Sequence, residues 1–539
     1  RRFEKKILPG YLQACRWFGG KSRKIVSLEI SHFPRIEVEG KAAYFLSIRA
    51  RYTDGLPETY FLPVTFLTKA EEIVRFLKNE PQSVVCYCKT PQQEGILIDA
   101  IYEEPFRNEL FWRIKSHTRI NVKGGQLSFE PGKILDELHV EREDVSSEVL
   151  RAEQSNTSVI YNGQFFFKIY RKLDTDINPD LEVVRYLSEQ TSFEHSPRYG
   201  GGVQFRDTVD PSFTILGLLQ NKIPNQGEAW TMMLEALNRY YEKVLAKVER
   251  DKPAPGLVQA DRIYFEDTPE RLQRLIGSVI YERATLLGKR TAEMHIALAS
   301  ETTDPDFMPE RFTQNYQRSI YSQHRKLVNE KLTALERRLP SLPEHIASEA
   351  RWILDIKDKI MECFSEIYGR KIEATKTRVH GDYHLGQVLF NGRDFFIIDF
   401  EGEPMHSISE RRLKRTPFKD VAGMIRSFHY AAYGQLVLNQ NYRKADMPQL
   451  EKWANQWFHY VSQYFLTAYL DTAGGHSFVP QDKEAMELLL RTYTLEKAIY
   501  EVGYEMNARP EWLRVPIRGV LYTMEGYTGQ ESREELKKD

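Results

Sequence analysis

The chain has 539 residues, of which 41% are apolar and 28% are charged, a composition typical of a soluble globular protein with more than one domain. Lysine and arginine number 75 and aspartate and glutamate 76, so the net charge of −1 favours neither nucleic acid nor an acidic membrane. No apolar run approaches the length of a membrane span, and the opening residues lack the apolar core of a signal peptide. We therefore expect a cytoplasmic protein.

The four cysteines are few for a chain of this length, and two of them form a C-x-C pair, Cys86 and Cys88, within an alternating strand pattern. We expect these two side chains to lie on opposite faces of the strand, where they neither bridge nor share a zinc ion. All four cysteines are therefore expected to be free thiols in a reducing compartment.

Residues 1–90 are expected to form one mixed subdomain. A helical pattern covers residues 2–18, β-rich segments follow, and residues 70–79 have the spacing of a short amphipathic helix. Residues 91–223 again favour strands. Asn162 and Gly163 separate two apolar runs, which is the strongest short-range signal for a β-hairpin.

From residue 224 to 539 the pattern becomes helical. Apolar positions recur with a helical period over residues 228–248, 280–298 and 348–368. The expected fold class is α+β, with a β-rich first part and a mostly helical second part. The predicted domains are residues 1–90, residues 91–223 and residues 224–539.

The segment 378–404, RVHGDYHLGQVLFNGRDFFIIDFEGEP, interrupts the helical part. It contains carboxylate and amide side chains that can act in catalysis or bind a metal ion. Asp382 is followed five residues later by Gln387. Asn391 and Gly392 predict a second hairpin, so Asp399 is expected at the end of its second strand, beside the loop that carries Asp382.

This arrangement is what phosphoryl transfer requires, since catalysis there is mainly positioning and charge stabilisation. One carboxylate faces the acceptor hydroxyl, and an amide oxygen and a second carboxylate hold Mg²⁺. We therefore predict Asp382 as the general base and Gln387 and Asp399 as metal ligands. Protein kinases commonly have asparagine at the amide position, so glutamine is a departure. The alternative interpretation is a polar hairpin loop whose acidic residues have no catalytic role.

A kinase site that uses ATP also needs a strand lysine for the nucleotide phosphates and a helical carboxylate to hold it. Lys168 lies in the second strand of the Asn-Gly hairpin, and Glu182 lies fourteen residues later in a predicted helix. A solvent-facing strand lysine is the alternative. The loop before the hairpin has no glycine-rich motif, but four polar residues there are candidates to bind phosphate: Ser155, Asn156, Thr157 and Ser158. A polar turn without a phosphate role is the alternative.

Several separated motifs resemble maltokinases, the enzymes that phosphorylate maltose with ATP. The segment from Asp382 to the helix near Asp420, the RWFGGK motif at Arg16–Lys21, and the segment 495–519 carry this resemblance, which spans residues 8 to 525. It implies a bilobal, protein-kinase-like fold of the aminoglycoside-phosphotransferase kind with an N-terminal cap. It also implies ATP and Mg²⁺ as cofactors and a product, maltose 1-phosphate, that feeds α-glucan and glycogen synthesis. A fused or associated trehalose synthase is an implied partner.

The resemblance also implies roles for further residues. Glu401 is a third candidate metal ligand, and His384 is a substrate candidate for which a structural role is the alternative. Four residues on one face of the C-terminal helix are candidates to bind the sugar: Lys497, Tyr500, Glu501 and Tyr504. A solvated face with lysine–glutamate pairs is the alternative. Asp420 is expected to cap a helix and to brace the catalytic loop.

Two other functions stay open from the sequence. A related kinase acting on another sugar, an aminoglycoside or choline would need an acidic pocket or an aromatic cage, and Lys497 disfavours both. A non-catalytic module that binds glucan or a partner enzyme is disfavoured by the presence of Asp382, Asp399 and Lys168.

Overall fold

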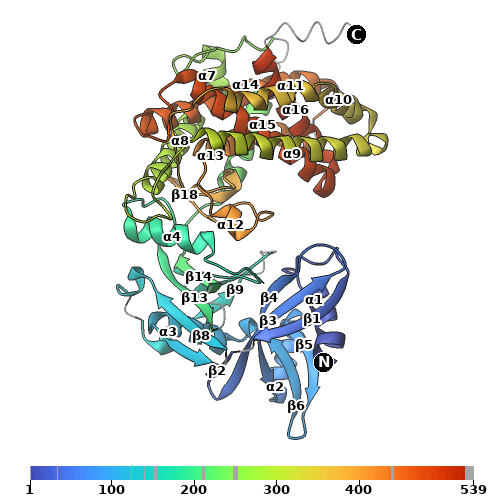
Figure 1. Ribbon diagram of the computed structural model, residues 1–539, viewed down its shortest axis with the longest axis vertical. Coiled ribbons are helices and arrows are strands. Elements are labelled where there is room, and N and C mark those ends of the chain that lie inside the picture. Colours follow the sequence, from blue (N-terminus) through green and yellow to red (C-terminus); the bar gives the residue numbers. More distant parts are fainter. Residues whose placement is uncertain are drawn as a thin grey trace. The chain divides into compact units, whose positions relative to one another are not determined.

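The computed structural model describes residues 2–32, 34–122, 124–138, 140–150, 155–208, 213–246, 253–438 and 442–528 (Figure 1). Contacts divide the chain into two compact units. The first unit comprises Arg1–Pro224 with Pro404–Arg411, and the second comprises Asn225–Glu403 with Arg412–Asp539. The domain limits drawn from the sequence stay predictions. Among the described residues, no helix has the length and apolar character needed to cross a membrane.

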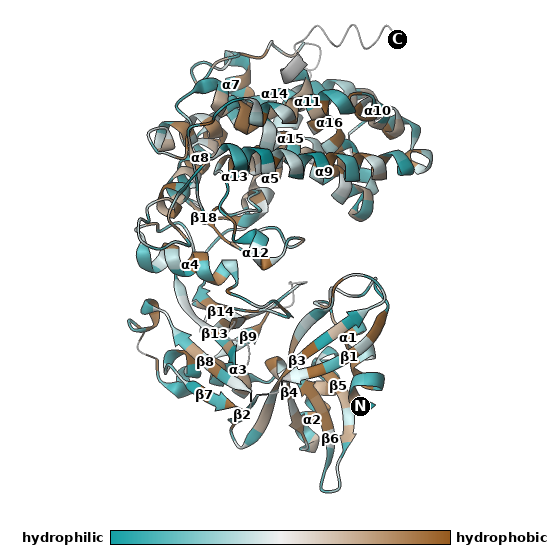
Figure 2. Ribbon diagram, in the orientation of Figure 1, coloured by the Kyte–Doolittle hydropathy of each residue, from teal (hydrophilic) through white to brown (hydrophobic). Residues whose placement is uncertain are grey.

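The first unit contains two antiparallel sheets, and the first of these belongs to the N-terminal region. Its main strand order is β1-β3-β4-β6-β5, with β2 paired to β3 and β12 to β4. The strands are β1 (Ile25–His32), β2 (Arg35–Val38), β3 (Lys41–Tyr52), β4 (Glu58–Leu67), β5 (Val84–Lys89), β6 (Glu94–Asp99) and β12 (Lys172–Leu173). Helices α1 (Leu8–Ala14) and α2 (Ala70–Asn79) accompany them. Strand β4 is buried along most of its length and is mostly hydrophobic in Figure 2.

The second sheet has the strand order β7-β8-β13-β14-β11-β10-β9. These strands are β7 (Arg119–Val122), β8 (Gly125–Pro131), β9 (Ser147–Val149), β10 (Thr157–Tyr161), β11 (Phe165–Ile169), β13 (Tyr199–Asp207) and β14 (Phe213–Asn221). Helices α3 (Glu104–Lys115), α4 (Pro179–Gln190) and α12 (Ile408–Arg411) complete the unit.

The predicted Asn-Gly hairpin is confirmed. Strands β10 and β11 pair antiparallel, with Tyr161 opposite Phe165 next to the turn. Three residues, 162–164, lie between this pair, and Asn162 and Gly163 have positive φ, at 49° and 66°, a conformation that these two residue types adopt readily.

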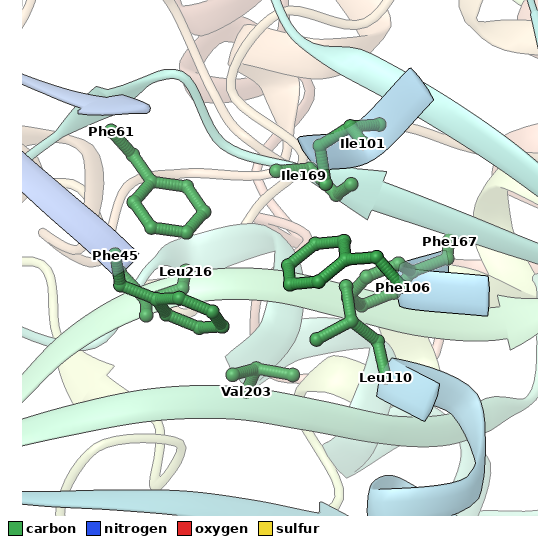
Figure 3. Close-up of a pocket in the computed structure, with 9 residues that line it drawn as sticks. All are labelled: Phe45, Phe61, Ile101, Phe106, Leu110, Phe167, Ile169, Val203 and Leu216. Carbon is green, nitrogen blue, oxygen red and sulfur yellow. The ribbon is translucent and has the colours of Figure 1, made fainter. Parts of the chain in front are cut away.

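An apolar junction joins the two sheets of the first unit. Phe45 and Phe61 from the first sheet meet edge to face with ring centroids 5.4 Å apart, and Phe106 of α3 lies 5.9 Å from Phe45. Figure 3 shows these rings facing a shared small space together with side chains from the second sheet, among them Phe167 and Val203. The two sheets therefore share a hydrophobic core.

A fully buried ion pair crosses the same junction. Arg171 and Asp99 are both 0% exposed, and Arg171 Nη2 lies 2.6 Å from Asp99 Oδ2. Arg171 Nε also donates to Thr157 Oγ1 at 2.8 Å, and its guanidinium lies 4.9 Å from the centre of the Trp17 ring. Arg171 thus connects the start of β10 to the N-terminal sheet.

The second unit is mostly helical. Its helices are α5 (Ala229–Leu245), α7 (Glu270–Ile276), α8 (Ser278–Leu298), α9 (Gln314–Arg338), α10 (Glu344–Asp355), α11 (Lys357–Gly369), α13 (Phe418–Leu438), α14 (Met447–Ala473), α15 (Lys483–Ala508) and α16 (Arg514–Thr528). Its short strands are β15 (Glu310–Arg311), β16 (Thr375–Lys376), β17 (Val388–Phe390) and β18 (Phe395–Ile397). Helix α8 runs along α14, and α13 along α15. The predicted second hairpin is confirmed, because β17 pairs with β18.

Three expectations from the sequence were wrong in detail. The helix expected over 348–368 is two helices that break at Ile356, and the strand-rich reading of 91–223 missed α3. Cys86 and Cys88 do not lie on opposite faces of β5, since strand residues two apart point to the same side. Their sulfurs lie 3.4 Å apart.

We predict that Asp99→Asn lowers the free energy of unfolding by about 3–5 kcal/mol, because it leaves the buried Arg171 charge uncompensated. Urea denaturation followed by tryptophan fluorescence measures this. Glu94→Gln is the matched control, since it breaks an exposed ion pair with Lys89 in the same sheet and is expected to cost less than about 1 kcal/mol. Equal losses in the two variants would contradict the importance of the buried pair.

Candidate active site

The Asp420 carboxylate binds the backbone of the loop that carries Asp382. The Asp420 carboxylate accepts hydrogen bonds from the backbone N–H of His380, at 2.7 Å, and of Gly381, at 2.9 Å. The predicted bracing role of Asp420 is thereby confirmed. Helix α13 begins at Phe418, so Asp420 lies in its first turn and is not its cap.

Buried polar groups hold Asp420 in turn. His295 Nε2 lies 3.1 Å from Asp420 Oδ2, and His295 Nδ1 lies 2.9 Å from the hydroxyl of Tyr469. His380 Nε2 lies 2.9 Å from the carbonyl oxygen of Ile398, directly before Asp399. This network therefore connects the Asp382 loop to the turn that follows β18.

Asp382 faces Lys497 of α15. Lys497 Nζ lies 3.0 Å from Asp382 Oδ1, and both side chains are about one quarter exposed, at 26% and 24%. Burial acts to raise the pKa of Asp382, but the charges of Lys497 and His384 outweigh it and lower the pKa to about 2. Asp382 is therefore an ionised carboxylate throughout the physiological pH range.

Gln387, Asp399 and Glu401 form an oxygen-rich cluster beside this loop. Gln387 Nε2 donates to Asp399 Oδ2 at 2.8 Å, and a carboxylate oxygen of Asp399 lies within 4.8 Å of one of Glu401. Asp399 has a φ of +67°, a strained conformation for a residue with a side chain. Such strain is common where a functional side chain must point in a fixed direction. Two carboxylates and an amide are the hard oxygen donors that Mg²⁺ prefers, so these residues fit such an ion.

His384 has a local structural contact. Its Nδ1 accepts a hydrogen bond from the backbone N–H of Gly386 at 3.1 Å and so caps the short 3₁₀ turn Leu385–Gln387. Burial lowers the pKa of His384, which favours the neutral ring. The acceptor role of Nδ1 then places the remaining proton on Nε2. The substrate role of His384 stays a prediction.

The four sugar candidates on α15 differ in their surroundings. The Lys497 ammonium lies 5.2 Å from the centre of the Tyr500 ring. Glu501 is buried and accepts two hydrogen bonds from Arg426, at 3.0 and 2.6 Å, while Tyr504 is 52% exposed. Lys497 and Tyr500 thus lie next to Asp382, Glu501 fixes α15 to α13, and Tyr504 faces solvent. Their substrate roles stay predictions.

Two further residues of this site escaped the sequence analysis. Burial and the neighbouring Glu403 carboxylate raise the pKa of Tyr500. Burial acts to lower the pKa of Lys497, but the charges of Asp382 and Glu403 outweigh it and raise this pKa. The Lys331 ammonium of α9 lies 5.8 Å from the centre of the Tyr500 ring. Glu403 lies two residues after Glu401 in the segment already singled out, so proximity could have suggested it. Nothing in the sequence pointed to Lys331.

In the first unit, Lys168 is buried on β11 and pairs with Asp180 of α4, with Nζ 3.1 Å from Oδ2. The Tyr170 hydroxyl donates to the same carboxylate at 3.2 Å. The solvent-facing alternative for Lys168 is therefore wrong. Glu182, favoured from the sequence as its partner, lies two residues further along α4, and its pairing with Lys168 stays a prediction. Asp180 was missed, although it occupies the first turn of a helix that the sequence predicted.

The four phosphate-loop candidates lie at the start of β10. Ser155 is exposed and Asn156 is half-buried. Thr157 is bonded to Arg171, and Ser158 is fully buried opposite Lys168 in the hairpin. Their contact with a nucleotide stays a prediction.

Comparison with known proteins identifies the N-terminal region and the fold. Residues 11–102 match the family model described as the maltokinase N-terminal cap domain. The structure of a glucosamine kinase in complex with glucosamine, ADP and inorganic phosphate superposes with a TM-score of 0.59 at 16% identity, covering 92% of this chain and 93% of that one. The predicted kinase-like fold with an N-terminal cap is thereby confirmed.

Two characterised relatives match part of the sequence. One is the glucosamine kinase of Mycolicibacterium smegmatis, 32% identical over 143 residues, or 25% of this chain and 32% of that protein. The other is the glucosamine kinase of Streptacidiphilus jiangxiensis, 28% identical over 138 residues, or 26% of this chain and 29% of that protein. The matches therefore span less than one third of each relative.

We predict that Asp420→Ala accelerates hydrogen exchange at the backbone amides of His380 and Gly381 by roughly 10–100-fold. Each amide loses a bond to a charged acceptor, which contributes about 1.5–3 kcal/mol. Mass-spectrometric hydrogen exchange measures this. Ser427→Ala is the matched control, because Ser427 Oγ accepts from the Leu385 amide at 3.0 Å. In Ser427→Ala we expect faster exchange at the Leu385 amide and unchanged exchange at the amides of residues 380 and 381. Unchanged exchange at residues 380 and 381 in Asp420→Ala would contradict the bracing role of Asp420.

Proposed function

We propose that this protein is an ATP-dependent sugar kinase that transfers the terminal phosphoryl group to the anomeric hydroxyl of maltose. The observation that carries the kinase proposal is the juxtaposition of the Asp382–Lys497 pair with the Gln387–Asp399–Glu401 cluster, joined through the network around Asp420. The match of residues 11–102 to a maltokinase cap supports maltose as the acceptor.

Asp382 is the proposed general base. Its carboxylate orients the acceptor hydroxyl and takes its proton. Because its pKa is about 2, Asp382 is always ready to accept a hydrogen bond but is a weak base. A loose phosphoryl-transfer transition state suits such a base, since the proton leaves late and positioning contributes most of the catalysis.

Gln387, Asp399 and Glu401 would hold Mg²⁺, and Lys168 would bind the nucleotide phosphates. When bound, the ion neutralises charge on the phosphate oxygens. The Gln387–Asp399 hydrogen bond holds the amide in one orientation, with its oxygen available as a ligand. In the first unit, the ion pair with Asp180 fixes the position of the Lys168 ammonium group.

The charged groups near Tyr500 suit the hydroxyls of a sugar acceptor. Two ammonium groups, of Lys497 and Lys331, lie 5.2 and 5.8 Å from its ring centre. The carboxylates of Asp382 and Glu403 lie beside them, so the group offers both donors and acceptors for hydrogen bonds to sugar hydroxyls. We further propose that the phosphorylated maltose feeds α-glucan synthesis. A trehalose synthase is the proposed partner, and the cytoplasm is the proposed location.

Glucosamine is a second candidate acceptor, favoured by the named relatives. The decisive assay measures ADP release with ATP and Mg²⁺ in the presence of maltose, glucose, glucosamine or choline. We expect kcat/KM for maltose to exceed kcat/KM for each of the other three acceptors by at least about tenfold. We also expect the product to have no reducing end, because its anomeric hydroxyl carries the phosphate. A higher kcat/KM for glucosamine than for maltose would make glucosamine the proposed substrate. The absence of turnover with all four acceptors would contradict the sugar-kinase proposal.

We further predict that Asp399→Asn raises the Mg²⁺ concentration needed for half-maximal activity by more than about tenfold, because a charged metal ligand becomes neutral. The KM for the sugar should stay within a factor of about two. Asp306→Asn is the control, since Asp306 is an exposed carboxylate paired with Arg412 in the same unit. An unchanged Mg²⁺ requirement in Asp399→Asn would remove Asp399 from the metal site.

A further inference from the structure

A pair of thiols lies in the N-terminal sheet, and nothing in the proposed kinase chemistry uses it. Cys86 and Cys88 lie two residues apart on β5, with their sulfurs 3.4 Å from each other. Both side chains are half-buried, so a small reagent can reach them, whereas Cys15 and Cys363 are buried.

The surroundings of the pair favour two-thiol chemistry over a metal site. Structural zinc takes four ligands. Among the described parts of the chain, no third histidine, cysteine, aspartate or glutamate gathers with these two sulfurs. The sulfurs therefore have each other as their principal chemical partners.

The backbone at this point tolerates a change in geometry. Strand β5 lies at the edge of the sheet, and among the strands that the structure describes β6 is the one that pairs with it. The ladder already has a register irregularity between Val84 and Cys86. The Cα atoms of strand residues two apart are separated by about 6.7 Å, within the upper part of the range that disulfides span. Closing the sulfur contact thus moves β5 against one paired strand, β6.

We propose that Cys86 and Cys88 form a dithiol that low-molecular-weight disulfides, such as glutathione disulfide, oxidise to an intramolecular disulfide. The site is a reversible redox modification site on the N-terminal cap. It is independent of the proposed kinase activity.

The reaction balances in two exchange steps. The Cys88 thiolate attacks one sulfur of glutathione disulfide, the reagent's S–S bond breaks, and one glutathione leaves as its thiolate. Cys86 then loses its proton to solvent and attacks the Cys88 sulfur, which releases the second glutathione. Two protein thiols are oxidised, and one glutathione disulfide is reduced to two glutathione molecules.

The order of attack follows from the surroundings of each sulfur. Burial, together with the hydrogen bond to Cys88, raises the pKa of Cys86 to about 12. Cys86 is therefore a protonated thiol near neutral pH, and the first attack is assigned to Cys88. Because Cys86 must lose its proton in the second step, ring closure is expected to accelerate as the pH rises from neutral toward alkaline values.

The test uses the full chain, reduced, freed of reductant, treated with glutathione disulfide, and alkylated after unfolding. Tryptic cleavage after Lys78 and Lys89 gives one peptide, 79–89, that contains both cysteines. We expect this peptide to lose two hydrogens in the wild type. We expect Cys86→Ser and Cys88→Ser to accumulate a glutathione adduct on the remaining cysteine, because neither can close the ring.

Cys15 and Cys363, at 8% and 0% exposure, serve as internal controls and should carry only the alkylating label. A wild-type peptide that keeps a stable glutathione adduct, or that stays fully alkylated after oxidation, would overturn the proposal. Faster adduct formation in Cys88→Ser, which keeps Cys86, than in Cys86→Ser, which keeps Cys88, would overturn the assigned order of attack. Circular dichroism of both serine variants confirms that they fold.

Discussion

Two hydrogen bonds from the backbone to the Asp420 carboxylate organise the second unit's site. They fix the backbone of His380 and Gly381 and therefore the direction in which the next residue, Asp382, leaves the chain. Gly381 has a φ of +86°, and a Cβ atom there would lie 3.2 Å from the Cα of Gly402, so this close approach of two loops requires glycine. A buried charge that accepts two N–H groups and faces His295 is costly to disturb, and this cost makes the loop rigid.

Contacts between helices also determine which charged group lies beside Asp382. Lys497 lies beside Asp382 on α15, and α15 is itself fixed to α13 by the buried Arg426–Glu501 pair, one helical turn further along. The Tyr430 hydroxyl donates to Glu505 at 3.2 Å, and Arg509 bonds the same carboxylate, so the α13–α15 contact continues toward the end of the helix. Buried ion pairs rarely add much net stability, but they specify one arrangement of the helices. Here that arrangement places an ammonium group beside the carboxylate proposed as the base.

Local signals in the sequence predicted the parts of the site that depend on neighbouring residues. Both Asn-Gly hairpins were found because the turn chemistry is local, and they placed Lys168 on β11 and Asp399 close to the end of β18, which stops at Ile397. The Asp420 brace was predicted because in kinase-like folds an acidic residue at such a helix start often braces the catalytic loop. The kinase-like fold with its cap was implied by the resemblance of several separated motifs to maltokinases.

Contacts between distant segments could not be predicted in the same way. Lys497 was chosen as a sugar residue, and nothing in its helical spacing indicated that it bonds Asp382, 115 residues away. Asp180 and Glu182 both lie on α4, and only coordinates show that Asp180 contacts Lys168. The Arg171–Asp99 pair, 72 residues apart, had no signal at all. The Cys86–Cys88 error was different in kind, since the strand period alone places both on one face.

Replacing Asp382 with asparagine most directly tests whether this carboxylate serves as the base for phosphoryl transfer. Turnover with ATP and the preferred sugar should fall by roughly 10²–10⁴-fold, while nucleotide affinity and melting temperature stay close to those of the wild type. Lys497→Met, measured alongside, keeps the carboxylate and removes its partner, so it separates loss of the base from loss of the ion pair. Turnover of Asp382→Asn within tenfold of the wild type would contradict the assignment.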